Sequence, residues 1–473
     1  MNRHYLALDL GAESGRAMLA RLADGRLELQ ELHRFANTPV PLPTGLYWDS
    51  LRLFHEMCEG IRMAARSVED LDGIAVDTWG VDFGLLSADG ELLHMPRHYR
   101  DGRTVGTSEE VLDAVPRAEI FRQTGIQFME INSLYQLWVY QRDSPELLSR
   151  ASKLLFMPDL FNYFLTGTYA AERTIASTSQ FYDPVRKCFA TDMLRKLGIT
   201  SSFFPELMDP GTELGPVLPY AADRCSLKHD TSVYTTGSHD TASAVAAVPS
   251  VGTDGWCYIS SGTWSLMGVE TEAPVINDAS LQANFTNEVG VGNTIRLLKN
   301  IPGLWVLQEC RRAWAKQGEE YSYAELMERA RAAKPTDTVI DLDQFISPGN
   351  HPERICAHCR ETEQEIPQDP GAITHVILQS LAERYKQVLE TLERLTGKAI
   401  ETIHIVGGGS RNRLLNQLTA DRTGRRVVAG PAEATAAGNA LTQAMGSGEL
   451  QSLDEIRVVV RNSFELEEFT PRK

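Results

Sequence analysis

The fold of this 473-residue chain is decided by the stretch Asp9-Leu10-Gly11-Ala12-Glu13-Ser14-Gly15-Arg16. A β-rich apolar run, residues 5–10, leads into it, and a second apolar run, residues 16–22, follows it. Two glycines between two such runs indicate a tight turn that joins adjacent strands. The backbone N–H groups of this turn can bind a phosphate, because glycine carries no Cβ atom to block the approach.

The polar side chains of the same stretch favour a phosphate site. Ser14 offers a hydroxyl and Arg16 a positive charge. Asp9, at the end of the first strand, offers a carboxylate that suits a water molecule of Mg²⁺. The Gly-Lys-Ser/Thr ending of a P-loop is missing from the stretch. A plain β-hairpin turn is the alternative interpretation.

A second hydroxyl-rich turn repeats this pattern later in the chain. Its sequence is Ser260-Ser261-Gly262-Thr263-Trp264-Ser265, and it joins apolar runs at 256–260 and 264–269. The two turns lie about 250 residues apart, which indicates an internal repeat. We expect the pair to bind a polyphosphate and the chain to divide near residues 245–255, into domains 1–248 and 249–473.

A glycine run, Val406-Gly407-Gly408-Gly409-Ser410, lies between a predicted strand at 403–406 and a predicted helix. Three glycines allow a flat or phosphorylated ligand to lie on the backbone at a helix N-terminus. The run lacks the G-x-G-x-x-G spacing, so it does not predict a dinucleotide site. A tight strand-to-helix turn is the alternative, although such a turn needs fewer glycines.

Two acidic motifs have competing interpretations. Asp240, within Gly237-Ser238-His239-Asp240-Thr241, is either a first-turn acid favoured by the helix dipole or a general base. A metal-dependent phosphohydrolase would need further His and Asp ligands, which the chain does not clearly offer. The stretch Asp77-Thr78-Trp79-Gly80-Val81-Asp82 combines an aromatic ring with two acids, which suits sugar recognition, but Trp79 and Asp82 fit a core and a turn equally well.

The order of predicted elements indicates α/β layers. Strands are expected at 27–35 and 73–79, and a helix is expected after an N-cap at Asp49. Residues 81–86 and 91–93 predict a hairpin. Residues 334–368 are expected to be loop-rich. They hold four possible zinc ligands, His351, Cys356, His358 and Cys359, but no second, separated pair, so a surface loop is the favoured interpretation.

The overall composition narrows the function classes. Lys plus Arg is 46 against 63 for Asp plus Glu, so the net charge of −17 and the lack of a basic block predict no nucleic-acid partner. No apolar run is long enough for a membrane span, and the N-terminus predicts a strand rather than a signal peptide. Seven cysteines, a sparse and odd number, favour a reduced protein of the cytoplasm.

Taken together, these motifs resemble those of the sugar-kinase, Hsp70 and actin superfamily, and within it the FGGY carbohydrate kinases. The two turns are similar to the phosphate loops of that superfamily, and the glycine run to its adenosine motif. Further similar stretches are residues 77–83, 238–245, 260–268, 299–305 and 430–435. The similarity runs in order along nearly the whole chain, except at residues 334–368.

The resemblance implies a fold and a set of site residues. The fold would be two actin-like domains, each a mixed β-sheet flanked by helices, with an interdomain cleft. The residues implied to bind ATP are Ala12, Glu13, Ser14, Gly15, Arg16, Thr263, Gln308 and Gly408. Those implied to bind the sugar are Gly80, His239, Asp240, Thr241 and Asn300. Asp240 would be the catalytic base and Asp9 the metal-binding residue. Glu13 must point away from the phosphates or be offset by Mg²⁺ and Arg16.

The resemblance also implies the reaction. It is strongest to those FGGY kinases that transfer phosphate from ATP, with Mg²⁺, to the O1 hydroxyl of L-rhamnulose. A kinase for another ketose or polyol, such as L-fuculose or L-xylulose, is the nearest alternative. A non-catalytic ATP-binding sugar sensor is a further alternative, but such a sensor would be expected to lack Asp240. The partners expected are small molecules, with the chain as a monomer or small homo-oligomer.

Overall fold

The structure, a computed structural model, describes residues 2–200, 202–252 and 254–472, and the chain forms two compact units. Unit 1 combines residues 1–249 with residues 270–297 and 434–463. Unit 2 consists of residues 250–269, 298–433 and 464–473. The division of the chain into domains 1–248 and 249–473 stays a prediction. None of the described helices is long and apolar enough to cross a bilayer.

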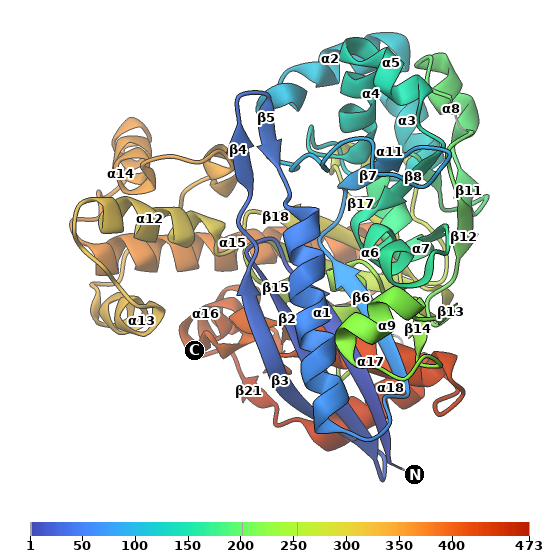
Figure 1. Ribbon diagram of the computed structural model, residues 1–473. Helices are drawn as coiled ribbons and strands as arrows, with labels where there is room; N and C mark the ends of the chain where they lie inside the picture. Colours follow the sequence, from blue (N-terminus) through green and yellow to red (C-terminus); the bar gives the residue numbers. More distant parts are fainter. Residues whose placement is uncertain (1, 201, 253, 473) are drawn as a thin grey trace. The chain divides into compact units, whose positions relative to one another are not determined.

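The sheet of unit 1 is built around β1, as the first apolar run predicts. Its strand order is β13-β14-β6-β1-β2-β3. The strands are β1 (Arg3–Leu10), β2 (Ser14–Ala23), β3 (Arg26–Ala36), β6 (Gly73–Thr78), β13 (Glu213–Pro216) and β14 (Ser232–Tyr234). β1 pairs antiparallel with β2 and parallel with β6 (Figure 1). β1 and β6 are apolar because both lie inside the sheet, buried from Tyr5 to Leu10 and along the whole of β6.

The helix expected after Asp49 is α1 (Ser50–Ser67), and it covers one face of this sheet (Figure 1). The Asp49 side chain accepts a hydrogen bond from the N–H of Arg52, which caps the helix. Its buried face, with Leu53, Met57 and Ile61, packs in one cluster with the apolar side chains of β1 and β2. The predicted N-cap and helix are therefore confirmed.

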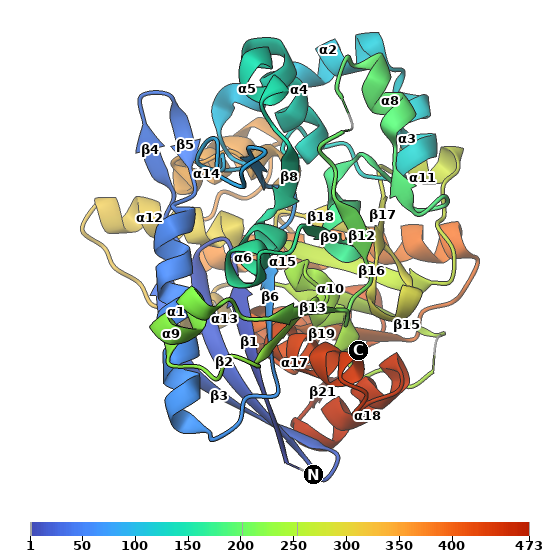
Figure 2. The ribbon, with the colours of Figure 1, turned by 45° about the vertical axis from the view of Figure 1, so that its right-hand side comes forward.

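Two helices from late in the chain complete unit 1. They are α17 (Ala434–Gly446) and α18 (Leu453–Ser463), drawn in red in Figure 2. Ala436 of α17 packs against Ala7 and Met18 of the sheet. Gln443 donates a hydrogen bond of 3.1 Å to the carbonyl of Leu6. The strands that carry the first turn are thus held by a segment more than 400 residues away, since Gln443 and Leu6 are 437 positions apart.

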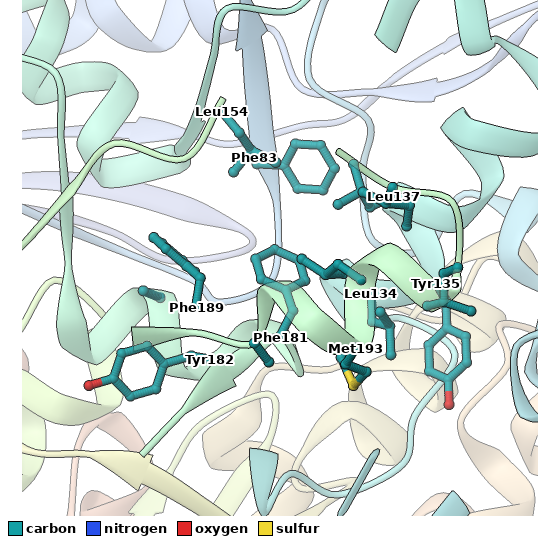
Figure 3. Packing of buried hydrophobic residues seen from close by; sticks show 14 of the residues in the cluster. Phe83, Leu134, Tyr135, Leu137, Leu154, Phe181, Tyr182, Phe189 and Met193 are labelled. Atoms are coloured by element: carbon teal, nitrogen blue, oxygen red, sulfur yellow. The ribbon is translucent and has the colours of Figure 1, made fainter. Parts of the chain in front are cut away.

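A second apolar cluster in unit 1 surrounds β7 (Phe83–Leu86) and β8 (Lys153–Phe156). Figure 3 shows Phe83, Leu134, Leu154 and Phe181 packed together in this cluster. The predicted hairpin of residues 81–86 with 91–93 forms, although it is short. Leu86 bridges Leu92, and the N–H groups of Ser87 and Leu93 donate to the carbonyls of Glu91 and Leu85 at 2.9 Å each. The prediction missed a second partner, because β7 also pairs antiparallel with β8, whose Leu154, Leu155 and Phe156 are buried.

The other elements of unit 1 are mostly short. They are β4 (Val40–Leu42), β5 (Gly45–Tyr47), α2 (Thr107–Ala114), α3 (Arg117–Thr124), α4 (Ser133–Asp143), α5 (Pro145–Ser149), α6 (Met157–Thr166), β9 (Ala170–Glu172), α7 (Arg173–Ala176), β10 (Tyr182–Asp183), β11 (Cys188–Phe189), α8 (Thr191–Lys196), β12 (Glu206–Met208), α9 (Pro219–Cys225), α10 (Asp240–Ala246), α11 (Asp278–Gln282) and β17 (Thr286–Val289).

The sheet of unit 2 repeats the arrangement of unit 1. Of the seven-stranded sheet β17-β18-β16-β15-β19-β20-β21, the strands from β18 onward reach into or belong to this unit. The strands are β15 (Trp256–Ser261), β16 (Ser265–Thr271), β18 (Ile295–Ile301), β19 (Thr402–Val406), β20 (Arg426–Ala429) and β21 (Glu467–Phe469). β15 pairs antiparallel with β16 and parallel with β19, just as β1 does with β2 and β6. The internal repeat predicted from the two turns is therefore confirmed.

The helices of unit 2 correct one expectation. They are α12 (Trp305–Lys316), α13 (Tyr323–Ala332), α14 (His351–Glu361), α15 (Pro370–Thr396) and α16 (Arg413–Thr423). The prediction that residues 334–368 are loop is wrong at α14. Pro352 starts this helix at a first-turn position where its missing N–H is harmless, and Ile355 and Cys359 bury one face. Proline there marks a helix start rather than a loop.

Candidate active site

The turn between β1 and β2 is closed by its own backbone and by Asn37. The N–H of Gly11 donates to the carbonyl of Ser14 at 2.9 Å. The backbone N–H of Asn37 donates to the carbonyl of Glu13 at 2.9 Å, and its side-chain amide donates to the carbonyl of Gly11 at 2.8 Å. Because these three carbonyls already accept hydrogen bonds, the turn favours anions at its N–H groups.

The five residues of this turn that we expect to bind ATP differ in exposure. Ala12, Ser14 and Arg16 are half-buried, and Gly15 is buried. A Cβ atom on Gly15 would stand 2.3 Å from the ring of Phe35, so this glycine is required for packing. The side chain of Glu13 is exposed. That this carboxylate avoids the phosphates stays a prediction.

Three charged side chains lie in one row across the centre of the sheet. Strand register places Arg16 beside Asp9, and Asp9 beside Asp77. Arg16 donates to and forms an ion pair with Asp9. Asp77 is fully buried and accepts a 2.6 Å hydrogen bond from Asn439 of α17. Burial raises the pKa of Asp77 well above its ordinary value, and the nearby charge of Asp9 raises it further.

Asp240, the predicted base, is the first residue of α10. Its side chain is 32% exposed, and its Oδ1 accepts a 3.0 Å hydrogen bond from the hydroxyl of Thr241. His239 precedes it, with Nε2 at 3.4 Å from the same Oδ1. Burial raises the pKa of the Asp240 carboxyl, whereas His239 and Thr241 lower it. The structure thus brings together three of the predicted sugar-binding residues, His239, Asp240 and Thr241.

The turn before Asp240 is anchored by Glu172, which the sequence analysis did not identify. Glu172 is fully buried and accepts hydrogen bonds from the N–H of Ser238 and from the N–H and hydroxyl of Thr174. The hydroxyl of Thr174 in turn accepts from the N–H of His239 at 3.2 Å. Burial raises the pKa of Glu172 to about 7. No sequence signal pointed to this acid, because the turn that Glu172 and Thr174 hold lies 65–66 residues further along the chain.

Gly80 lies in a strained turn that follows β6. Val81 has φ of +68°, which is rare for a β-branched residue, and the N–H of Asp82 donates to the carbonyl of Gly80 at 2.9 Å. Thr178 holds this turn by accepting from the N–H of Val81. A Cβ atom on Gly80 would stand 3.3 Å from the Thr178 side chain. Strain of this kind is typical of functional turns.

Asp82 belongs to the core and not to a sugar site. It is fully buried, and its two oxygens accept hydrogen bonds from the indoles of Trp48 and Trp79, the amide of Gln136 and the N–H of Tyr99. These four donors leave little capacity for a sugar hydroxyl. The structure therefore supports the core interpretation of Trp79 and Asp82.

In unit 2, the turn between β15 and β16 contacts the start of α12. The N–H of Gly262 donates to the carbonyl of Trp264 at 2.8 Å, and the N–H of Leu304 donates to the carbonyl of Gly262 at 3.1 Å. Gln308 donates from its side chain to the hydroxyl of Thr263 at 3.2 Å. The structure therefore joins Thr263 and Gln308, two residues that we expect to bind ATP.

The glycine run after β19 packs against the same turn. A Cβ atom on Gly409 would stand 2.1 Å from the Ser261 hydroxyl, and one on Gly407, where φ is +81°, would stand 3.1 Å from the Ser261 carbonyl. A Cβ atom on Gly408, by contrast, would meet open space. Gly407 and Gly409 are thus required for packing, which leaves Gly408 as the glycine that faces free volume. Gly408 is the one predicted to contact adenosine.

Asn300, the remaining predicted sugar contact, is half-buried on β18 within unit 2. The other predicted sugar contacts belong to unit 1. The four possible zinc ligands lie on α14, where His351 and Cys359 are buried. Within the described ranges, no group of three or more His, Cys, Asp or Glu residues is arranged to hold a metal ion.

Two α/β units, each with a hydroxyl-bearing hairpin turn and a parallel strand beside it, define a two-domain ATPase of the actin-like class. The chain matches two family models, "FGGY family of carbohydrate kinases, N-terminal domain" over residues 4–247 and "FGGY family of carbohydrate kinases, C-terminal domain" over residues 257–447. This protein belongs to the FGGY family of carbohydrate kinases, and ATP is the co-substrate of that family.

Curated relatives in this family are identical to this chain at more than a third of the aligned positions. The chain is 43% identical to a rhamnulokinase of Bacteroides thetaiotaomicron, over 100% of this chain and 96% of the relative. It is 43% identical to the Enterococcus faecalis rhamnulokinase over 98% and 94%, and 40% identical to that of Bacillus subtilis over 99% and 95%.

Solved structures show the same fold at much lower sequence identity. A xylulose kinase from Lactobacillus acidophilus has a TM-score of 0.80 at 14% identity, covering 99% of this chain and 94% of that one. The glycerol kinase of Plasmodium falciparum with ADP has a TM-score of 0.79 at 14% identity, covering 100% and 94%. These neighbours establish the two-domain actin-like fold.

Proposed function

We propose that this kinase phosphorylates L-rhamnulose at O1, giving L-rhamnulose 1-phosphate and ADP in L-rhamnose catabolism. The observation that carries the proposal is the similarity to curated rhamnulokinases, 37–43% identical over 98–100% of this chain. The arrangement of Asp240, His239 and Thr241 at the start of α10 supports it, because a partly exposed carboxylate is available there as a base.

Both hairpin turns are proposed to bind the nucleotide. In unit 1, Ala12 to Arg16 offer N–H groups, a hydroxyl and a guanidinium to the phosphates. In unit 2, Thr263 and Gln308 bind ATP, and Gly408 leaves room for its adenosine end. Preorganised donors of this kind stabilise the charge on the transferring phosphoryl group.

The acceptor side is proposed to consist of Gly80, His239, Asp240, Thr241 and Asn300. The O1 oxygen of the sugar attacks the γ-phosphorus, the bond to the bridging oxygen breaks, and ADP leaves. The proton of O1 passes to the Asp240 carboxylate. The carboxylate is a much weaker base than the alkoxide of the sugar. It can still accept the proton, because the transition state is largely dissociative and proton transfer comes late.

The carboxylate at the end of β1 fits the Mg²⁺ that such kinases use. Asp9 is 6% exposed and supplies the hard oxygen donors that this ion prefers, and Mg²⁺ keeps several waters and binds through one or two carboxylates plus substrate phosphates. We propose that Asp9 holds the ion through water. Bound there, Mg²⁺ would neutralise charge on the β- and γ-phosphate oxygens.

The test is release of ADP in a coupled assay with Mg-ATP and a panel of ketoses and polyols. We expect turnover on L-rhamnulose, and a loss of about 10²–10⁴-fold in kcat for Asp240→Asn, since the amide cannot accept the proton. The KM for the sugar should change little. The matched control is Asp278→Asn, because Asp278 is also the first residue of a helix, α11, but is exposed and outside the site.

Each outcome has a distinct meaning. Turnover on L-fuculose or L-xylulose instead would keep the mechanism and overturn the sugar assignment. Near-normal turnover of Asp240→Asn would overturn the base. ATP binding without turnover on any sugar would favour a sensor. We further propose that the protein works as a monomer or small homo-oligomer in the cytoplasm, a reducing compartment that suits its seven free cysteines.

A further inference from the structure

A buried ion pair lies beside His239 in unit 1. Arg296 of β18 is fully buried, Glu288 of β17 is 4% exposed, and Nη2 of the arginine lies 3.1 Å from Oε2 of the glutamate. The guanidinium also donates from Nε and Nη2 to the carbonyl of Val289, at 3.1 Å each. A buried ion pair is a weak source of stability, so its position beside the site suggests another role.

Arg296 determines which nitrogen of His239 carries the proton. Its Nη2 lies within hydrogen-bond geometry of Nδ1 of His239, at 3.2 Å. A guanidinium can only donate, so Nδ1 must accept and the ring proton lies on Nε2. Oε2 of Glu288 lies 3.3 Å from the same Nδ1 and 3.1 Å from Nη2 of Arg296, so it competes for His239 only if the ring proton moves to Nδ1. Glu288 therefore serves to balance the charge of Arg296.

This tautomer makes the two oxygens of Asp240 unequal. Nε2 of His239, the protonated nitrogen in this tautomer, lies at ion-pair distance from Oδ1 of Asp240, 3.4 Å, and the hydroxyl of Thr241 donates to the same oxygen at 3.0 Å. The carboxylate also accepts from the backbone N–H of Thr241, and no side chain within the described ranges donates to Oδ2. One oxygen is thus held by the protein, and the other can accept the proton of the sugar hydroxyl.

We propose that Arg296, balanced by Glu288, is a positioning residue for phosphoryl transfer. It fixes His239 with the proton on Nε2, so that His239 and Thr241 hold Oδ1 of Asp240 and leave Oδ2 as the base. This inference rests on the proposed role of Asp240 in the kinase reaction. It adds two residues far from Asp240 in sequence to the machinery of the reaction.

The first test reads the tautomer directly in the wild-type protein. The probe is ¹⁵N-labelled histidine, measured by long-range ¹H–¹⁵N correlation at a pH well above the ordinary histidine pKa of about 6.5. The His239 signals are assigned by their loss in His239→Asn. We expect a protonated Nε2 and an unprotonated Nδ1. A protonated Nδ1 would overturn the proposal, and this readout does not depend on which sugar is the substrate.

The second test is a double-mutant cycle with Arg296→Lys and His239→Asn, run on whichever sugar the wild type phosphorylates. Arg296→Lys should lower kcat about 10- to 100-fold, because the base is misplaced. The KM for the sugar should stay within about twofold. In the His239→Asn background, where the donor is already gone, Arg296→Lys should lower kcat by less than about twofold more.

Additive effects in the cycle, or a rise in KM with unchanged kcat, would show that Arg296 does not act through His239. The matched control is His229→Asn, an exposed histidine that pairs with Asp223 on the surface and should leave kcat unchanged. Thermal melts of each variant separate loss of folding from loss of positioning. If Arg296→Lys does not fold, the tautomer measurement alone decides the proposal.

Discussion

At the scale of single residues, burial decides what each carboxylate can do. Asp82 is fully buried among four donors, and burial raises its pKa to about 6. Its oxygens already accept hydrogen bonds from the core residues Trp48, Trp79 and Gln136. Asp240, with a third of its side chain exposed, keeps an oxygen available for a substrate. Two acids that look alike in sequence therefore have different roles.

A third carboxylate, Asp159 of α6, allows a prediction on stability and pH. It is 2% exposed, its Oδ1 accepts from the N–H of Glu172 at 3.1 Å, and its Oδ2 has no hydrogen-bond partner among the described residues. Burial raises the pKa of Asp159 well above its ordinary value, and the charge of Glu172 raises it further. Its folded-state pKa thus exceeds its unfolded-state pKa, so ionisation penalises folding as pH rises above the unfolded value of about 4.

We expect Asp159→Asn to remove this penalty. The variant should match or fall below the wild type in stability at a pH below about 4, where both forms are neutral. Above that pH the free energy of unfolding of the variant should rise relative to that of the wild type, by about 1 kcal/mol or more at neutral pH. Urea titrations across the pH range measure the difference. If the difference in free energy of unfolding between variant and wild type were the same at acid and neutral pH, the expected ionisation of Asp159 would be contradicted.

At this scale, the sequence could predict residues whose chemistry is visible in a short motif. The N-cap Asp49 and the turn residues around Gly11 are examples, because their partners lie within a few positions. Asn37, Glu172 and Arg296 could not be predicted in this way. The contacts that give them these roles join residues 24–66 positions apart, so only the folded chain shows them.

At the scale of elements, close packing fixes which glycines are required. The run after β19 gives a matched pair. We expect Gly409→Ala to lower the free energy of unfolding by about 1–3 kcal/mol, because its Cβ would overlap Ser261. Gly408→Ala should stay within about 0.5 kcal/mol of the wild type, since its Cβ meets open space.

The same pair separates packing from nucleotide binding. If adenosine lies over Gly408, then Gly408→Ala should raise the KM for ATP and leave the KM for the sugar unchanged. Chemical denaturation and steady-state kinetics measure the two effects. Equal stability losses for both variants would mean that the packing at Ser261 is not as tight as described.

A second glycine fixes a helix pair. In unit 1, α17 crosses α10 so closely that a Cβ atom on Gly438 would stand 1.8 Å from the carbonyl oxygen of Ser243. Gly438→Ala should therefore destabilise the protein by about 3 kcal/mol or more, since a backbone atom must move. It should also lower kcat, because α10 carries Asp240. The control on the same helix is the half-buried Thr435→Ala, and calorimetry that shows equal melting of both variants would refute the argument.

The elements that the sequence predicted well are those defined by local patterns. β1, β2 and β3 follow one another with short turns, and α1 has an N-cap and one apolar face. The pairing of β7 with β8 was missed because the partner lies about 70 residues further along, where no local pattern points to it. α14 was missed because its first turn contains Pro352, a residue that is common in loops as well as at helix starts.

At the scale of the whole molecule, unit 1 is assembled from three separate stretches of chain. The last, residues 434–463, supplies Asn439 to Asp77, Gln443 to the carbonyl of Leu6, and Ser447 to the hydroxyl of Tyr5. Family resemblance predicted two domains in chain order. The resemblance did not predict that residues 434–463 return to unit 1, because the pattern of a helix does not show which sheet the helix covers.

We expect a chain that ends at residue 433 to lose the ordered sheet of unit 1. Without α17 and α18, the buried face that contains Ala7 and Met18 is open to water. Hydrogen exchange should show the amides of β1 and β6 unprotected. The control is a chain that ends at residue 463, which keeps both helices. Strong protection of β1 in the shorter chain would contradict this dependence.

The late return of α17 also sets an order of events during synthesis on the ribosome. β1 and β6 emerge first, but their covering helix begins at Ala434, 356 positions after the end of β6 at Thr78. At typical translation speeds that interval lasts roughly 20–70 s. During that time one apolar face of the nascent sheet is exposed to water. A chaperone would be needed most in this period. The groups that arrange Asp77 are among the last of the molecule to meet.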